Sequence, residues 1–362
     1  MKRHFSAIVL AISLAYAGFP ALAGDTVNIT QSGINNKADT TQSANASSST
    51  NAITINQKND LNDANVSQSN LQGTNTASVN QTGGINPTIS SNNKAKITQS
   101  DSSNVKAAIV QTGNANEASI SQSNIRGSGT ASINQTAIGT SNTAKIEQSD
   151  SADVKASITQ DNNFNYAQIF QLGVTDATAN ILEAGFISTV VQDKGSNGVV
   201  ATIKNGGSNQ AHVTQSNVNV GNAIINNLGG AGNAASIAQH DGKNLYAKIS
   251  TDGHGRQSFS TVVQTGSFQR ATIEQGKPGS DLSDSSAYIN QDGTMNDAAI
   301  IQAGGSFNNA TIAQTGLGGL NMAKITQAGS ANGAYITQNG SNFNATVSQT
   351  GDSNYAKVSQ HF

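Results

Sequence analysis

The amino-acid sequence predicts an all-β fold, namely a β-solenoid with two strands in each coil and about 14 coils. Three observations carry this prediction. Glutamine recurs every 11 to 13 residues along most of the chain. A β-branched residue lies two positions before nearly every one of these glutamines. Glycine and asparagine, which tolerate tight reversals of the backbone, recur between the glutamines.

The composition excludes several classes of protein. Of the 362 residues only 11% are charged, where an ordinary globular chain has about 25%. There is no cysteine, which rules out disulfide frameworks, thiolate metal sites and cysteine nucleophiles. The net charge of −2 gives no electrostatic footprint for nucleic acid. A repetitive β architecture, or a polar low-complexity tract, remains.

The first residues have the pattern of a secretory signal peptide. Lys2 and Arg3 form a basic start, residues 7–17 are apolar, and small residues precede the bond between Ala23 and Gly24. The apolar stretch is too short to span a bilayer, which takes about 20 residues. We therefore expect residues 1–23 to be removed on export and residues 24–362 to form a single repeat domain.

The repeat unit is Ala-x-Ile-x-Gln, as in residues 118–122. Between Gln31 and Gln360 there are 28 register positions, and glutamine fills 24 of them. The four exceptions are Glu183, Asn205, Asn227 and Thr251. Ile or Val lies two positions before 27 of the register positions, and Ala lies four before 24 of them. Alternation with period two is typical of a strand with one buried face, so Ala, Ile and Gln should point inward.

Turn residues occupy fixed places between the strands. Glycine lies two positions after the register position in 15 repeats, and asparagine lies six before it in 15 repeats. In stacked coils, like residues lie over like residues, so the Gln and Asn amides should form hydrogen-bonded ladders along the axis. The ladder residues that represent this prediction are Gln31, Gln42, Gln111, Gln122, Gln160, Gln171, Gln302, Gln314, Gln349, Gln360, Asn116, Asn165 and Asn354.

The ends of the repeat array are expected to be assembly sites. The array starts with Val27 and Ile29, directly after the predicted cleavage site, and finishes with Ala356 and Val358. Repeat arrays usually carry polar caps, and no cap is evident here. An uncovered strand edge is a template for pairing with another chain.

The phrase Gln-x-Gly-x-x-Asn-x-Ala-x-x-x-Gln, intact at residues 111–122 and 349–360, resembles the curlin repeats of curli amyloid subunits. The resemblance extends over nearly the whole chain after residue 23, which is far longer than the usual five repeats. It implies a secreted subunit of extracellular curli-like fibres, that is a fimbrium or pilus of a biofilm matrix that serves surface adhesion. It also implies self-polymerisation, a related curli subunit and an outer-membrane secretion channel as partners, and contact with surfaces or matrix polymers. Whether the chain would act as a major or a nucleating subunit stays open.

Chemistry of other kinds finds little support in the sequence. The histidines are dispersed without the spacing of metal ligands, and no nucleophile elbow or phosphate-binding loop occurs. We therefore expect no enzyme activity, no cofactor, no metal site and no nucleic-acid partner. Two alternative architectures fit the sequence less well. A β-helical adhesin or polysaccharide-acting β-helix would need loops with clustered acids or arginines, and an ice-binding solenoid would need a regular outward array of threonine.

Overall fold

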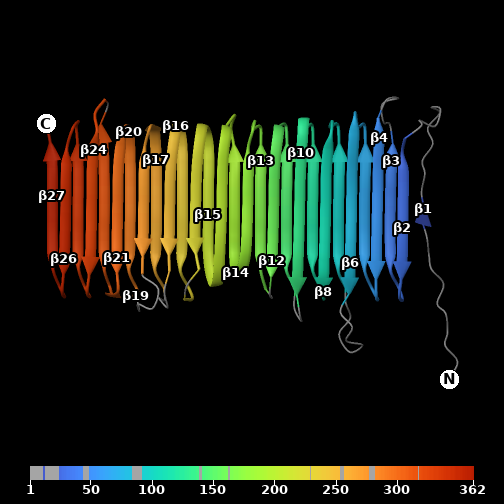
Figure 1. Cartoon of the computed structure of the whole chain (residues 1–362), viewed down its shortest axis with the longest axis horizontal. Coiled ribbons are helices and arrows are strands. Elements are labelled where there is room, and N and C mark those ends of the chain that lie inside the picture. Colours follow the sequence, from blue (N-terminus) through green and yellow to red (C-terminus); the bar gives the residue numbers. More distant parts are fainter. Residues whose placement is uncertain are drawn as a thin grey trace, which may run out of the picture. The chain divides into compact units, whose positions relative to one another are not determined.

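The structure is a computed structural model that describes residues 11–12, 24–43, 49–83, 92–137, 141–161, 164–228, 230–252, 257–276, 282–316 and 318–362. The chain divides into two compact units, Met1–Asp176 and Ala177–Phe362. The repeat pattern does not mark this division. Each unit is a parallel β-solenoid with two strands per coil, which confirms the predicted fold class (Figure 1). Over the described residues the units together make about 13 turns, close to the 14 predicted.

Unit 1 has two stacks of strands, and each strand pairs in parallel with the strand one coil away. The strands of face A are β2 (Thr26–Ser32), β4 (Thr50–Lys58), β6 (Thr74–Gly83), β8 (Val105–Gly113), β10 (Arg126–Ala137) and β12 (Ala152–Asp161). The strands of face B are β3 (Lys37–Ser43), β5 (Asp63–Ser69), β7 (Lys94–Ser100), β9 (Glu117–Ser123), β11 (Thr143–Ser149) and β13 (Tyr166–Leu172). The short β1 (Ala11–Ile12) pairs with β3. The rest of the predicted signal peptide, including Ala23, lies outside the described residues, so the cleavage site stays a prediction.

Unit 2 has the same arrangement, with longer strands in its first coils. There β14 (Thr178–Asp193), β15 (Asn197–Asn227) and β16 (Ala234–Thr251) each contribute to both stacks. The other strands of face C are β18 (Arg270–Gln275), β21 (Asn296–Ala303), β24 (Asn321–Ala328) and β26 (Asn344–Thr350). Those of face D are β17 (Phe259–Ser267), β20 (Ser286–Thr294), β23 (Asn309–Gly316), β25 (Gly333–Asn339) and β27 (Tyr355–His361). A two-residue pair, β19 (Leu282–Ser283) and β22 (Gly305–Ser306), closes a turn.

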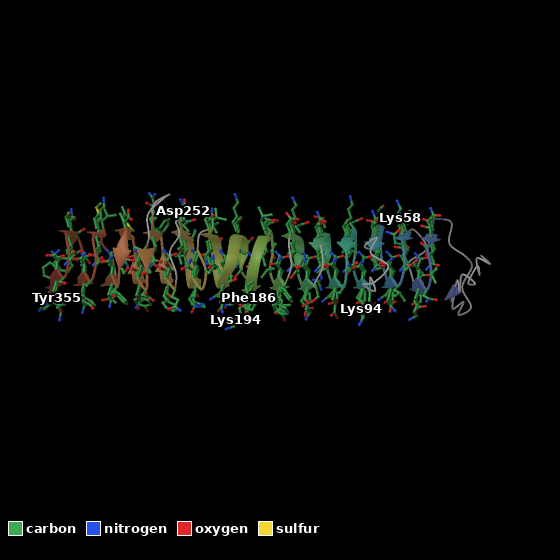
Figure 2. The ribbon with its side chains drawn as sticks, turned by 90° about the horizontal axis from the view of Figure 1, so that it is seen from below. Lys58, Lys94, Phe186, Lys194, Asp252 and Tyr355 are labelled. Carbon is green, nitrogen blue, oxygen red and sulfur yellow. The ribbon has the colours of Figure 1, made fainter. Side chains whose placement is uncertain are left out.

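The core of each unit is made of the inward residues of the repeat. The register is uniform, so Ala131, Ile133 and Gln135 lie level with Ala107, Ile109 and Gln111 of the next coil. The isoleucines are fully buried, and the alanines and glutamines beside them nearly so. Alternate residues point to the surface, as the period of two predicts. In unit 1, Lys58 and Lys94 project from opposite faces of the solenoid (Figure 2).

The corners between strands need a left-handed backbone. Many of these corners are Asn, Asp or Gly, the residues that adopt a positive φ with little strain. At Gly113, an added Cβ would lie 1.6 Å from the carbonyl oxygen of Ala137 in the next coil. Glycine is therefore required at this corner both by the backbone angle and by the closeness of the neighbouring coil.

Candidate functional site

The glutamines form continuous hydrogen-bonded ladders through unit 1. In ladder B, Gln99 Nε2 donates to Gln122 Oε1 at 2.9 Å, and Gln122 Nε2 donates to Gln148 Oε1 at 2.8 Å. All the bonds run in this direction, from each coil to the next. Ladder A contains Gln31, Gln57, Gln81, Gln111, Gln135 and Gln160, and ladder B contains Gln42, Gln68, Gln99, Gln122, Gln148 and Gln171. Each ladder therefore has a direction, with acceptors facing one end and donors the other.

The second N–H of each glutamine amide joins the two faces of the solenoid. Gln111 Nε2 on face A donates to the carbonyl oxygen of Lys94 on face B at 2.9 Å, and Gln135 Nε2 donates to that of Glu117 at 3.1 Å. A glutamine side chain has two donor hydrogens and one acceptor oxygen, and these bonds use all three. A buried amide that is satisfied in this way escapes the cost of leaving a polar group without a partner. Glutamine is thus suited to this inward corner by both length and chemistry.

The asparagines form a second set of ladders at the turns. The backbone N–H of Asn116 donates to Asn93 Oδ1, and the backbone N–H of Asn165 donates to Asn142 Oδ1. Their side-chain amides donate to a carbonyl oxygen four residues earlier, which closes the turn. Asn354 makes both kinds of bond in the last turn of unit 2. These bonds fix the turn and tie it to the neighbouring coil.

Unit 2 has one complete ladder and one incomplete ladder. Ladder D runs without a break through Gln192, Gln215, Gln239, Gln264, Gln291, Gln314, Gln338 and Gln360. Ladder C has glutamine–glutamine bonds only through Gln275, Gln302, Gln327 and Gln349. Its four earlier positions are Glu183, Asn205, Asn227 and Thr251. All four exceptions to the glutamine register thus lie in successive coils of one ladder.

The missing glutamines leave buried acceptors in the core. Asn205 and Asn227 lie one coil apart in β15, where Gly206 lies against Leu228. Within the described residues, the Oδ1 atoms of both asparagines have no hydrogen-bond partner although they are buried. The Nδ2 atom of Asn205 still donates to the carbonyl oxygen of Ile187 on face D at 3.1 Å, and that of Asn227 donates to the carbonyl oxygen of Gln210 at 3.2 Å. The cross-links between the faces are kept, but the bonds along the axis are lost.

Two serines on face D compensate in part for this defect. They occupy the inward position that is alanine in most other repeats. Ser188 Oγ accepts a hydrogen bond from Asn205 Nδ2 at 3.2 Å, and Ser260 Oγ donates to Gln275 Oε1. Gln275 is the first glutamine after the gap, so Ser260 supplies the donor that a preceding glutamine would otherwise supply. The substitutions on the two faces are therefore matched across the core.

One outward column on face B of unit 1 carries charges of alternating sign. On face B, Lys37, Asp63, Lys94 and Glu117 lie level in successive coils, so their charges alternate. The hydrogen bond that Lys37 donates to Asp39, together with the negative charges of Asp63 and Asp39, raises the pKa of Lys37. In-register stacking places opposite charges next to each other, whereas a slip by one coil would place like charges together. The column therefore favours the observed register.

The first and last strands differ from the internal ones in burial. Val27 and Ile29 in β2, and Ala356 and Val358 in β27, are half-buried, whereas the equivalent residues of internal strands are buried. Gln31 Oε1 is a buried acceptor with no partner in the described part of the chain. Each of these strands pairs with a neighbour on one side only among the described residues. These are the positions that the sequence predicts as assembly ends.

Two further classes of site have no structural counterpart in the described residues. No group of three or more His, Cys, Asp or Glu side chains is arranged to hold a metal ion. None of the described segments is a helix with the length and hydropathy needed to cross a membrane.

Comparison with known proteins gives one match. The family model of the Curlin associated repeat matches residues 320–351 and 329–361. The resemblance that the repeat phrase indicates is thereby confirmed in this C-terminal part of the chain. No curated protein matches the chain. The matched residues contain the last coils of unit 2, in which ladders C and D are both complete.

The four exceptions are evident in the sequence, whereas their position in one ladder is evident from the structure. The signal was present, because the exceptions fall at every second register position from Glu183 to Thr251. In a coil with two strands, every second position belongs to the same face. The pairing of Ser188 and Ser260 with the defects needed the structure, because it depends on which residues face each other across the core.

Proposed function

We propose that this protein is a secreted structural subunit of extracellular curli-like amyloid fibres, and that it polymerises by end-to-end stacking of coils. The curlin-repeat match and the parallel solenoid with its amide ladders support this proposal. The signal-peptide pattern supports export, and biofilm adhesion, a related subunit and a secretion channel belong to the same proposal. The role is structural and not enzymatic.

The direction of the ladders is the observation that carries the proposal. At the first coil, the Oε1 atom of Gln31 is a buried acceptor without a partner among the described residues. In the last coil, Gln349 Nε2 donates to Gly333 O, and Gln360 Nε2 donates to Asn344 O. Each of these amides has a second N–H, which in the preceding glutamine rungs from Gln275 and from Gln192 onward points to the next glutamine. The C-terminal coil of one copy thus has free N–H donors, and the N-terminal coil of a second copy has an acceptor oxygen that can receive one of them.

The outward residues of the two end coils are also complementary. If the repeat continues across two copies, β2 follows β26 and β3 follows β27. Lys357 of one copy then lies level with Asp39 of the next, and Val358 with Thr40. Lys357 and Asp39 carry opposite charges, which favours this register. Asp39 also forms an ion pair with Lys37 at 2.8 Å, so a second cation beside it completes a small charge network.

The experiment is seeded elongation followed by thioflavin fluorescence and electron microscopy. We expect the chain without residues 1–23 to form fibres without denaturant. Lys357→Asp should slow elongation of seeds, and combining it with Asp39→Lys should restore the rate. Lys324→Asp is the matched control, because Lys324 has the same outward place in an internal coil. Elongation that is unaffected by Lys357→Asp, or is not rescued by the double change, would contradict the end-to-end arrangement.

A further inference from the structure

Face D of unit 2 is interrupted by a groove of about 270 Å³. The groove crosses β14, β15, β16 and β17 at the level of the outward residues. Ala234 and Ser236 of β16 lie level with Gln210 and His212 on one side, and with Phe259 and Thr261 on the other. Because the two central side chains are small, they form a trough between taller neighbours. Phe186 and Tyr355 project from the same side of unit 2 (Figure 2).

The dimensions of the trough follow from the solenoid itself. Its two walls are separated by two interstrand spacings, about 9.6 Å between backbones. Its floor is formed by the small outward residues Ala234 and Ser236 of β16. The four strands that line the groove lie within three interstrand spacings, about 14 Å along the axis. The trough therefore fits one thin, extended chain.

The walls combine one aromatic ring with neutral hydrogen-bonding groups. Phe259 is 56% exposed, which makes it one of the more exposed aromatic side chains in a strand of unit 2. Gln210, His212 and Thr261 supply donors and acceptors around it. His212 Nε2 lies 2.9 Å from Thr214 Oγ1, which leaves Nδ1 as the second hydrogen-bonding atom of the ring. Partial burial lowers the pKa of His212, which favours the neutral form of the ring.

We propose that this groove binds an uncharged, unbranched glycan chain. A pyranose ring has an apolar C–H face, which would cover the Phe259 ring, and a rim of hydroxyl groups, which would bond to Gln210, His212 and Thr261. Sites of this kind combine aromatic surface with a few polar groups that fix orientation. The groove is formed within unit 2, so the proposal does not depend on polymerisation.

The structure disfavours two other occupants. An extended peptide binds best where it can pair with a free strand edge, but β16 is paired on both sides, with β15 and β17. A polyanion would need cations, and no Lys or Arg is among the described residues that line the groove. The same lining contains no Asp or Glu, so the pair of carboxylates that glycoside hydrolysis uses is not provided. The groove is a binding site and not a site of cleavage.

The test is calorimetric titration of the whole chain without residues 1–23, with cellohexaose as the neutral glycan. Phe259→Ala should weaken binding by about tenfold or more, because among the described residues that line the groove Phe259 alone has a phenyl ring. Ser236→Phe, which fills the trough and keeps Phe259, should also weaken binding. Phe307→Ala is the matched control, because Phe307 is an exposed phenylalanine of unit 2 outside the groove lining. It should bind as the unmodified chain does.

Three outcomes would overturn the proposal. The first is the absence of any binding of cellohexaose. The second is equal binding by the Phe259→Ala and Phe307→Ala variants. The third is tighter Phe259-dependent binding of hexagalacturonate, or of an uncharged peptide, than of cellohexaose. Circular dichroism of each variant checks that the solenoid is intact, and Ser236→Phe keeps the test valid if Phe259→Ala fails to fold.

Discussion

Ladder B of unit 1 passes hydrogen bonds from Gln42 to Gln171 without a break, whereas ladder C of unit 2 has glutamine bonds only from Gln275 onward. The column of Ile and Val residues beside both ladders is buried in the described coils, and Thr40 in the first coil of ladder B is its one polar member there. The coils over the gap still stack in parallel register. The apolar column and the backbone pairing therefore hold the solenoid together. The amide ladder adds hydrogen bonds that satisfy buried polar groups. It also gives the solenoid a direction along its axis.

The largest loss of stability should come from a buried carboxylate, and it should be equal beside ladder B and beside the gap of ladder C. Ile169 lies beside ladder B and Ile225 beside the gap of ladder C, and both are fully buried. Replacing either by Asp places a carboxylate in an apolar column and should cost about 4 kcal/mol or more. Denaturant unfolding of dilute chain measures this cost. Gln168→Asp, at an outward position beside Ile169, is the control and should be tolerated. A much smaller loss of stability for Ile225→Asp than for Ile169→Asp would mean that the core beside the gap is loosely packed.

Replacing a ladder residue by alanine should destabilise ladder B more than the gap of ladder C. Gln122 accepts from Gln99 and donates to Gln148 and to the Lys106 carbonyl oxygen. Gln122→Ala leaves a buried donor and a buried acceptor unpaired and opens a cavity, so it should cost about 3 kcal/mol. Asn227→Ala in the gap removes an acceptor that is already unpaired, and should cost about 1 kcal/mol. The midpoints of unfolding in guanidinium chloride, compared for variants with equal m-values, measure the two costs. Equal costs would show that the continuous ladder has no added stability.

Most of the fold could be predicted from the sequence because its repeat has a strict period. The inward places of Ala131, Ile133 and Gln135 follow from alternation alone, and the parallel stacking follows from the equal length of the coils. The groove around Ser236 could not be predicted in this way. It depends on which outward residues of four successive coils lie level with one another. The hydrogen bond from Ser260 to Gln275 could not be predicted from the sequence either, because it joins side chains on the two different faces.

A smaller effect tests the compensation at the end of the gap. Ser260 Oγ is the donor to Gln275 Oε1, which lies in the buried core. Ser260→Ala should leave this oxygen unpaired and cost about 1–2 kcal/mol. Ser236→Ala, an outward serine in the preceding coil, is the matched control and should be nearly neutral. If both changes have the same small effect on the unfolding midpoint, Ser260 has no compensating role.

The smallest effect, and the one of opposite sign, comes from rebuilding the ladder. Asn205→Gln with Asn227→Gln lengthens two adjacent side chains, so that residue 205 can donate to residue 227 along the axis. The change gives a partner to one buried acceptor and should stabilise the unit by about 1 kcal/mol. Ser188 now bonds to Asn205 and occupies part of the space that a glutamine needs, so Ser188→Ala should increase the gain. Hydrogen exchange of the amides of β15 measures the local opening free energy directly. Faster exchange in the triple variant than in the unmodified chain would mean that the asparagines are fitted to this part of the core, and that the gap is not a defect.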